Sequence, residues 1–425
     1  MLPGPHLPFP PLLCPLTMSL NTESPIDPIP FARPCIGEDE VEAVVRVMRG
    51  GWLTTGEETR KFESEFANAV SSPHAVAVNS ATAGLHLALE ALGIGPGDRV
   101  LVPTWTFTAT AEVVHHLGAT VELVDVDESA MLLDLEVVER RIRQEVSIRA
   151  VVPVHFAGQA CDMERLLAVA HRHGVAVIED AAHAFPATCR GRPIGSLGDL
   201  TVFSFYATKT ITTGEGGMIT TADAQLAERM RTMRLHGISR DVFDRYRAPG
   251  ASWKYDVVAA GFKYNLTDLA AAIGRVQLAR AEELRAARQQ IAEYYYEQLT
   301  GLPIGLPVVR DTRDLHAWHL FPIRLEDDAP CTRDQLVASL AEQGIGTSVH
   351  FIPLHRHPFW KSRPSIRGRR FPNADAAFSR SLSLPLYASL THRDCRRVVA
   401  ALRRLLTPSP SRSLVGVHLD EPIRS

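Results

Sequence analysis

The alternation of short apolar runs with amphipathic stretches predicts an α/β fold. Apolar positions recur at helical spacing in residues 37–49 and 59–70. The β-branched run HAVAVN at 74–79 is followed by strong helix formers that end on Gly93. The same order of strand, turn and helix recurs as far as LTVFSF at 200–205, so we expect a mostly parallel sheet with helices on both faces.

The pattern changes in the last third of the chain and predicts a second, smaller unit. Residues 266–299 are typical of one long connecting helix. After it come the strand-like AWHLFPIRL, the helical DQLVASLAEQG, the strand-like TSVHFIPL and a final helix over residues 392–405. The sequence therefore divides into a disordered N-terminal extension, a large α/β domain, a small α+β domain and a tail, over residues 1–29, 30–280, 281–406 and 407–425.

The first 17 residues are rich in proline and carry no lysine or arginine. They lack the charged start and the helical apolar run of a signal peptide, so we expect disorder there. No stretch approaches the roughly 20 consecutive apolar residues that a membrane helix needs. This pattern predicts no membrane segment.

Composition narrows the class of protein further. The chain has 425 residues, of which 45% are hydrophobic and 22% charged, values typical of a folded globular protein. The net charge of −3 offers no strong field to attract nucleic acid or an anionic membrane. Six scattered cysteines show no zinc-binding spacing, which favours a reducing cytoplasm and predicts no metal site.

Three features suited to catalysis or ligand binding lie at the carboxyl ends of predicted strands, where open α/β sheets form their ligand crevice. The first is the segment of small residues from Asn79 to Gly84. Backbone N–H groups and hydroxyls at such a helix start can approach a phosphate. The same residues also fit an ordinary helix cap by Ser80 or Thr82.

The second feature is Asp180, which ends the apolar run VAVIED. A carboxylate at that place faces the crevice and can pair with a ring nitrogen or a metal; it can equally cap a helix over the AAHA that follows. His183 lies on a similar face if this segment is helical. A lone histidine is more often structural, so His183 counts only beside the other features.

The third feature is Lys209, which stands between an apolar, aromatic strand and a turn rich in threonine and glycine. Partial desolvation there lowers the pKa of a lysine and makes a neutral amine available for a Schiff base. The other four lysines lack this setting; they are Lys61, Lys254, Lys263 and Lys361. Ser204, five residues before Lys209, offers a second hydroxyl for the same phosphate.

A phosphate cradle, a carboxylate and a lysine in this order are what pyridoxal phosphate needs. The phosphate sits at a helix start, an acid keeps the pyridine nitrogen protonated, and a lysine binds the aldehyde. Each feature alone is weak evidence for this cofactor, whereas the three together in this order are strong evidence. A dehydrogenase of the Rossmann type is a poor alternative, because the first strand is not followed by G-x-G-x-x-G.

Several segments resemble the DegT/StrS family of sugar-nucleotide aminotransferases over residues 31–405. Among them are NSATAGLHLAL, IEDAAHA, FSFYATKTITTGEGG, GFKYNLTDLAAAIG and HAWHLFPIR. The resemblance implies the fold of the aspartate aminotransferases (fold type I) and the cofactor pyridoxal 5′-phosphate. Some relatives in the family are dehydratases with histidine in place of the lysine, and Lys209 argues against that branch.

The resemblance also implies residue roles. Lys209 becomes the Schiff-base lysine and proton shuttle, Asp180 the partner of the pyridine nitrogen, and His183 a contact of the phenolic oxygen. The phosphate ligands become Ala81, Thr82 and Ser204, joined by Asn265 from a neighbouring subunit, which implies a homodimer with shared active sites. Phe107 becomes the residue that stacks on the cofactor ring. From the residues alone, Trp105 competes with it.

The expected substrates follow from the same resemblance. Three segments, IEDAAHA, KYNLTD and HAWHLF, are similar to the branch that makes UDP-4-amino-4-deoxy-L-arabinose, which implies glutamate as donor and a UDP-4-keto sugar as acceptor. His350 is a candidate substrate contact or, equally, a buried structural residue. The alternatives are a 3-keto sugar nucleotide or a keto-cyclitol aminated from glutamine, and a non-catalytic regulatory protein that binds the cofactor.

Overall fold

The computed structural model describes residues 27–239 and 255–407. Most of the predicted N-terminal extension and nearly all of the predicted tail lie outside these residues, as does Lys254. Within them, no helix combines the length and the apolar character needed to cross a bilayer.

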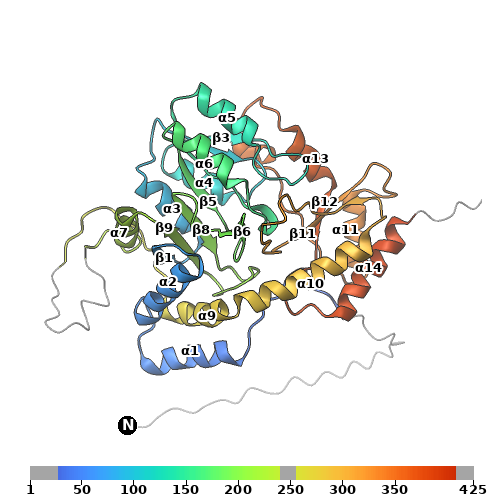
Figure 1. Ribbon diagram of the computed structural model, residues 1–425, viewed down its shortest axis with the longest axis horizontal. Helices are drawn as coiled ribbons and strands as arrows, with labels where there is room; N and C mark the ends of the chain where they lie inside the picture. Colours follow the sequence, from blue (N-terminus) through green and yellow to red (C-terminus); the bar gives the residue numbers. More distant parts are fainter. Residues whose placement is uncertain (1–26, 240–254, 408–425) are drawn as a thin grey trace, which may run out of the picture.

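A seven-stranded sheet forms the larger part of the molecule (Figure 1). Its strands, in spatial order, are β1 (His74–Val78), β9 (Gly217–Thr221), β8 (Leu200–Ser204), β5 (Ala176–Asp180), β4 (Ile148–Val151), β2 (Arg99–Pro103) and β3 (Thr120–Val124). β9 runs opposite to the other six strands of this sheet. The expectation of a mostly parallel sheet is confirmed, whereas β9 itself was not predicted.

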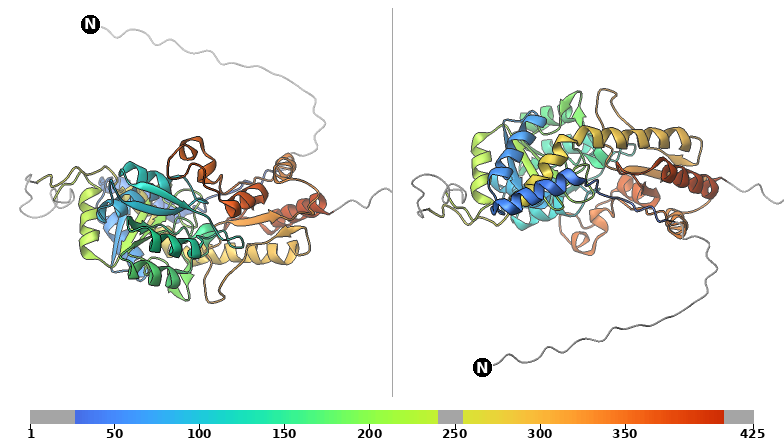
Figure 2. Two further views of the ribbon diagram at one scale, coloured as in Figure 1. Left: turned by 90° about the horizontal axis from the view of Figure 1, so that it is seen from above. Right: turned by 90° about the horizontal axis from the view of Figure 1, so that it is seen from below.

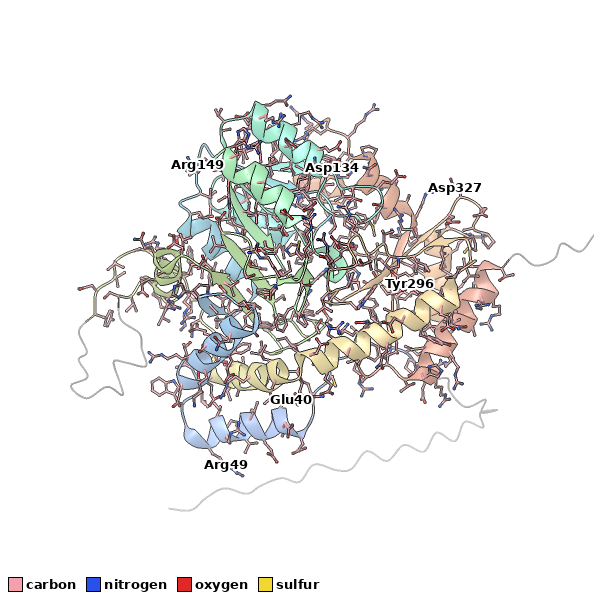
Figure 3. The ribbon with its side chains drawn as sticks, in the orientation of Figure 1. Glu40, Arg49, Asp134, Arg149, Tyr296 and Asp327 are labelled. Carbon is pink, nitrogen blue, oxygen red and sulfur yellow. The ribbon has the colours of Figure 1, made fainter. Side chains whose placement is uncertain are left out.

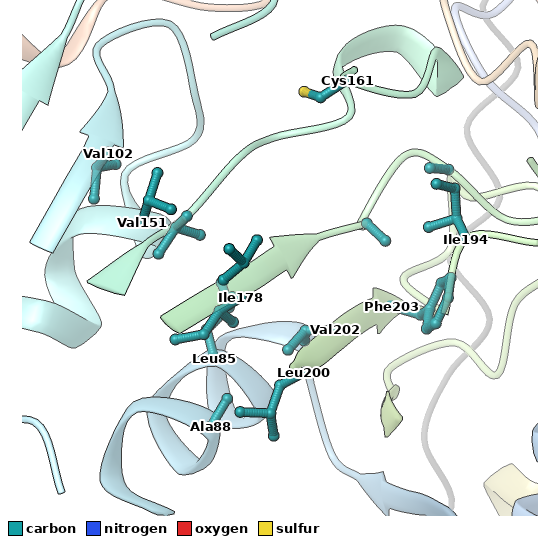
Figure 4. Packing of buried hydrophobic residues seen from close by; sticks show 14 of the residues in the cluster. Leu85, Ala88, Val102, Val151, Cys161, Ile178, Ile194, Leu200, Val202 and Phe203 are labelled. Carbon is teal, nitrogen blue, oxygen red and sulfur yellow. The ribbon is translucent and has the colours of Figure 1, made fainter. Parts of the chain in front are cut away.

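Helices cover both faces of this sheet, because side chains alternate between faces along each strand. The helices of this part are α1 (Glu38–Gly50), α2 (Glu57–Ala69), α3 (Ala81–Ala91), α4 (Ala109–His116), α5 (Leu135–Gln144), α6 (Met163–Arg172), α7 (Ala224–Met233) and α9 (Asp268–Ala279). Val202 of β8 packs under α3, while the next residue, Phe203, points to the opposite face and meets Phe66 of α2 at 5.0 Å between ring centroids (Figure 4). A Cβ on Gly84 would lie 2.7 Å from Val202, so glycine permits the close approach of α3.

A second core surrounds a small antiparallel sheet. Its strands are β10 (Ile304–Gly305), β11 (Phe321–Leu325) and β12 (Ser381–Leu384), and its helices are α10 (Ala281–Leu299), α11 (Arg333–Glu342) and α14 (His392–Leu406). Tyr295, Phe321 and Leu402 are fully buried at its centre. The views of Figure 2 show α10 and α14 alongside each other. The domain limits remain a prediction.

Shorter elements complete the described chain. The hairpin consists of β6 (Thr188–Cys189) and β7 (Arg192–Pro193); the short helices are η1 (Phe156–Gly158), η2 (Leu354–Arg356), α12 (Pro358–Lys361) and α13 (Pro372–Arg380). Residues 347–354 were predicted as a strand, but residues 347–353 are irregular apart from one bridge between Ser348 and Ser383, and Leu354 begins η2. This segment contributes side chains to the wall of a cavity instead of pairing along a sheet.

The long helix predicted over residues 266–299 is two helices, α9 and α10, separated at Arg280. Arg280 has φ −101° and ψ 4°, outside the helical range. Its guanidinium lies 3.1 Å from the carboxylate of Glu40, which is buried between α1 and α9 (Figure 3). An ion pair with a third helix therefore accompanies the break, and periodicity within the segment does not reveal it.

Asp268 joins α9 to the start of α2. Its carboxylate accepts hydrogen bonds from the backbone N–H groups of Gly56, Glu58 and Thr59 at 2.7, 3.2 and 3.0 Å, and from the Thr59 hydroxyl at 2.7 Å. Free N–H groups at a helix start need such acceptors. Because Asp268 is only 3% exposed, water cannot replace it.

We expect Asp268→Ala to lower the free energy of unfolding by about 3 kcal/mol, because buried donors lose a charged acceptor. Asp268→Asn retains one acceptor oxygen and should cost about 1 kcal/mol. Urea titration followed by circular dichroism measures both. Equal stability of the two variants would contradict this role of the carboxylate.

Candidate active site

A cavity of about 590 Å³ lies at the carboxyl ends of β5 and β8. The last third of the chain closes it with residues such as His319, Ser348 and Phe351. Of the nine predicted site residues, eight line this cavity: Ala81, Thr82, Phe107, Asp180, His183, Ser204, Lys209 and His350. Their individual roles stay predictions.

One end of the cavity is built for an anion. Ser80 caps α3, its hydroxyl accepting from the Ala83 N–H at 3.1 Å, while the N–H groups of Ala81 and Thr82 have no acceptor among the described residues. Such free N–H groups favour a bound anion. A Cβ on Gly217 would lie 2.8 Å from the Ala81 nitrogen, so only glycine lets β9 approach this turn. Capping by Ser80 therefore leaves the N–H groups of Ala81 and Thr82 available to a ligand.

Asp180 occupies the end of β5 and is 5% exposed. Its carboxylate accepts from the Thr110 hydroxyl at 2.8 Å and from the Ala182 N–H at 3.2 Å. Burial raises the pKa of Asp180, and these two hydrogen bonds oppose the rise. The segment that follows is a turn, closed by the Ala184 N–H on the Ala181 carbonyl, so Asp180 does not cap a helix as the alternative required.

Lys209 follows β8 and borders the same cavity. Its Nζ lies 3.4 Å from Nε2 of His319. Burial lowers the pKa of Lys209 to about 8, although the nearby Asp180 carboxylate acts in the opposite direction. Lys61, in contrast, is exposed and paired with Glu57, and Lys263 and Lys361 are also exposed.

Three imidazoles surround the lysine. The ring of His183 lies 4.3 Å from that of His319, and its Nδ1 accepts from the Ala157 N–H at 3.3 Å. His350 meets the Ser383 hydroxyl at 3.1 Å. Burial lowers the pKa of His350 to about 4 and those of His183 and His319 well below the ordinary value. All three are therefore neutral at neutral pH and add no positive charge beside Lys209.

His319 was not predicted as a site residue. It is 5% exposed, it lines the cavity, and its Nδ1 is buried without a hydrogen-bond partner in the described chain. The segment HAWHLF, which contains it, contributes to the family resemblance, but a lone histidine gives no sign of which lysine it will face. Thr110, whose hydroxyl donates to Asp180, was also not predicted, because its local sequence does not indicate which carboxylate it will contact.

The structure distinguishes the two aromatic candidates for the residue that stacks on the cofactor ring. Phe107 is 61% exposed and lines the cavity, whereas Trp105 is 1% exposed and packs edge-on against Phe156.

Asn265 is the predicted site residue that the cavity does not include: its amide donates to the Thr55 hydroxyl at 2.7 Å. Its backbone forms a bridge with Val78 at the end of β1, so Asn265 lies beside the anion end of the cavity without lining it.

These residues fit pyridoxal phosphate. The cavity combines free N–H groups at a helix start, a glycine whose place no Cβ could take, a buried carboxylate and a largely desolvated lysine. The phosphate, the ring nitrogen and the aldehyde of the cofactor need these three kinds of partner. Fold and site together define a fold type I enzyme that depends on pyridoxal phosphate.

The chain belongs to the DegT/DnrJ/EryC1/StrS aminotransferase family, whose profile matches residues 34–403. It is 45% identical to the spore coat polysaccharide biosynthesis protein SpsC of Bacillus subtilis over 89% of this chain and 97% of that protein. The putative sugar aminotransferase Spr1654 of Streptococcus pneumoniae, solved with PMP, has a TM-score of 0.83 at 32% identity and covers 89% of this chain and 98% of its own. Its PLP form has a TM-score of 0.81, at the same identity, over 89% and 100%.

The sugar aminotransferase CalS13 of Micromonospora echinospora is also similar, with a TM-score of 0.79 and 30% identity over 88% of this chain and 99% of its own. The protein is thus an aminotransferase that uses pyridoxal phosphate. These relatives do not support the specific likeness to the arabinose enzyme, because they are described as spore coat polysaccharide and sugar aminotransferase proteins.

We expect Gly217→Ala to weaken cofactor binding about tenfold and to destabilise the protein by about 1–3 kcal/mol, because the new Cβ displaces the turn at Ala81. Equilibrium dialysis against pyridoxal phosphate measures the first effect. Gly50→Ala is the matched control, since nothing lies within 4 Å of a Cβ there. Unchanged affinity in Gly217→Ala would show that β9 does not set the anion cradle.

The lowered pKa of Lys209 predicts a pH profile. Below about pH 8 the amine is mostly protonated and unreactive; above it the neutral amine predominates. Modification of cofactor-free protein by trinitrobenzenesulfonate should therefore accelerate through pH 8, with Lys209→Ala supplying the background. Asp180→Asn should move the midpoint to lower pH, because it removes the charge that stabilises the ammonium. A midpoint above pH 10 would contradict the assigned burial.

Proposed function

We propose that the protein transfers an amino group from glutamate to the keto group of a nucleotide-linked sugar, with a UDP-4-keto sugar as acceptor. One observation carries the proposal: Lys209, Asp180 and the free N–H groups at the start of α3 line a single cavity. A sugar scaffold agrees with the relatives named for sugar aminotransfer and polysaccharide synthesis. The nucleotide, the keto position and the donor come from the sequence resemblance.

The proposed roles of the residues follow their positions. Ala81, Thr82 and Ser204 bind the phosphate, Phe107 stacks on the ring, and His183 meets its phenolic oxygen. Asp180 holds a proton on the ring nitrogen. When bound, pyridoxal phosphate supplies the electron sink for the carbon that exchanges its amino group.

Lys209 moves the protons, because its Nζ exchanges between ammonium and amine near pH 8. His319 orients this amine: its neutral Nε2 accepts a hydrogen from Lys209 Nζ, which leaves the proton of the ring on Nδ1. That buried N–H lacks an acceptor among the described residues, so an oxygen of a substrate is its proposed partner. His350 completes the substrate side of the cavity.

We further propose a homodimer in which Asn265 completes the phosphate site of the partner. Its position outside the cavity of its own chain agrees with this arrangement. A cytoplasmic location agrees with the described cysteines, none of which forms a disulfide.

The absorbance spectrum of the cofactor-loaded protein tests the first half of this reaction. Glutamate, added without acceptor, should replace the visible band of the cofactor with the near-ultraviolet band of its amine form. Lys209→Ala should lose turnover by at least about 10⁴-fold and still fold, since the residue lies at the cavity border rather than in the core.

Other outcomes decide between the alternatives. A spectrum that responds to glutamine but not to glutamate would favour a keto-cyclitol or another scaffold. Loaded protein that responds to no donor would favour the non-catalytic regulatory protein. Matched assays with 4-keto and 3-keto sugar nucleotides would identify the acceptor, and substantial activity of Lys209→Ala would remove the assigned role of the lysine.

A further inference from the structure

Two buried side chains behind the cofactor cavity form a hydrogen-bonded pair. Glu179 of β5 and His155, in the loop after β4, are fully buried, and Nε2 of His155 lies 2.8 Å from Oε2 of Glu179. Glu179 directly precedes Asp180, and successive side chains of a strand point to opposite faces of the sheet. Glu179 therefore points away from the cavity that Asp180 lines, and neither member of the pair lines that cavity.

The hydrogen bonds of the pair determine where the histidine carries its proton. Nδ1 of His155 accepts from the Cys161 N–H at 3.0 Å. Hydrogen bonding raises the pKa of His155 against the effect of burial, but a second ring proton would meet this N–H at Nδ1. The ring proton is therefore on Nε2 and is donated to Glu179. The other carboxylate oxygen accepts from the Gly198 N–H and the Thr201 hydroxyl, both at 2.7 Å.

The ring of His155 closes a strained turn. Cys161, whose N–H it accepts, lies six residues further on, and between them are Ala157 with φ 60° and Gly158 with φ 103°. Positive φ is rare for a residue with a Cβ and persists only where surrounding contacts enforce it. The His155 N–H also donates to the Asp180 carbonyl at 3.1 Å. Both the side chain and the backbone of His155 thus attach the turn to β5.

The turn orients His183. The Ala157 N–H donates to Nδ1 of His183 at 3.3 Å, which leaves the ring proton of His183 on Nε2. The ring forms no other hydrogen bond within the described part of the chain. Because His183 lines the cavity, its Nε2–H is the group that can donate to a bound ligand.

The same turn holds the segment that carries His319. The carbonyls of Gly158 and Ala157 accept from the N–H groups of Ala317 and Leu320, at 3.0 and 3.2 Å, on either side of His319. A Cβ on Gly158 would lie 3.1 Å from the His319 nitrogen, so the two backbones are in close contact. Nε2 of His319 lies 3.4 Å from the amine of the cavity lysine. A displaced turn would therefore move this imidazole relative to the amine.

We propose that His155 and Glu179 are positioning residues for the cofactor site. The pair holds the turn at residues 156–160, and through it orients His183 and His319. The inference rests on the proposed function, since that function gives His183 the phenolic oxygen of the cofactor as its partner. Burying a polar pair costs desolvation free energy, and such pairs can be retained because they specify one conformation. Here that conformation is a strained turn on which two imidazoles of the site depend.

Glu179→Gln tests the pair with a nearly isosteric change. The new amide N–H faces Nε2–H of His155, and the ring can relieve this contact only by moving its proton to Nδ1, where the Cys161 N–H lies. We expect the turn to shift and water to reach Lys209, so the midpoint of trinitrobenzenesulfonate modification in cofactor-free protein should rise from about pH 8 by about one unit. In loaded protein, the pH midpoint of the visible band should also rise by about one unit, because the ring oxygen loses a donor that stabilises its anionic form.

His155→Gln is the second variant and decides the question if Glu179→Gln fails to fold. Its amide can still donate to Glu179, but the Cys161 N–H loses its acceptor, so both midpoints should rise. The double variant should shift them no further than either single variant, because the two residues act as one unit. Glu40→Gln is the matched control: Glu40 is also buried and accepts several hydrogen bonds, but it lies between α1 and α9. Its replacement should lower stability in urea and leave both midpoints at the values of the parent protein.

Shifts of both midpoints in the variants of the pair, and not in Glu40→Gln, would support the positioning role. Unchanged midpoints in a folded variant of either His155 or Glu179 would overturn it. Equal shifts in Glu40→Gln would also overturn it, since a general loss of stability would then explain them. Neither midpoint requires a substrate, so this test is independent of the donor and the acceptor. Loss of the glutamate response in the parent protein would instead refute the proposed function.

Discussion

The chemistry of this protein depends on the desolvation of one lysine. Burial lowers the pKa of Lys209 to about 8, and the Asp180 carboxylate limits how far it falls. If His183, His319 and His350 were protonated, their charges would lower it further and would repel a cationic ring. Their burial keeps them neutral, so Asp180 is the charged partner of Lys209, and Glu215 is the other carboxylate that lines the cavity.

The fold brings this pair together through the geometry of a parallel sheet. β5 ends at Asp180 and β8 ends just before Lys209, and the carboxyl ends of parallel neighbours meet at one edge. The antiparallel strand β9 then returns beside β8, where Gly217 lets its backbone pass close to the start of α3. The sheet topology and the absence of a Cβ at Gly217 thus place the N–H groups at the start of α3 opposite the Asp180 carboxylate.

The positions of these residues in the fold could be predicted from the sequence, because each of them belongs to a local element. A strand end followed by Asp180, a helix start at Ala81 and a lysine in a desolvated turn are all visible in short segments. The features that were predicted wrongly or missed depend on contacts between distant parts of the chain. The break at Arg280 coincides with an ion pair to Glu40, and the function of residues 347–354 depends on a cavity wall that no periodicity describes. His319 could not be paired with Lys209 for the same reason, since 110 residues separate them.

This division between local and distant features also separates the two walls of the cavity. The cofactor end of the cavity comes mainly from residues 80–216, attached to strands whose positions the core fixes. The opposite wall comes from His319, Ser348, His350 and Phe351, and the segment that follows them is held against the loop after β2 by a few hydrogen bonds. Ile352 and Phe359 in that segment are 48% and 46% exposed, whereas Asp180 and Gly217 are buried at the sheet edge. Exposed positions in that segment therefore tolerate substitution at less cost to folding than the buried positions at the sheet edge.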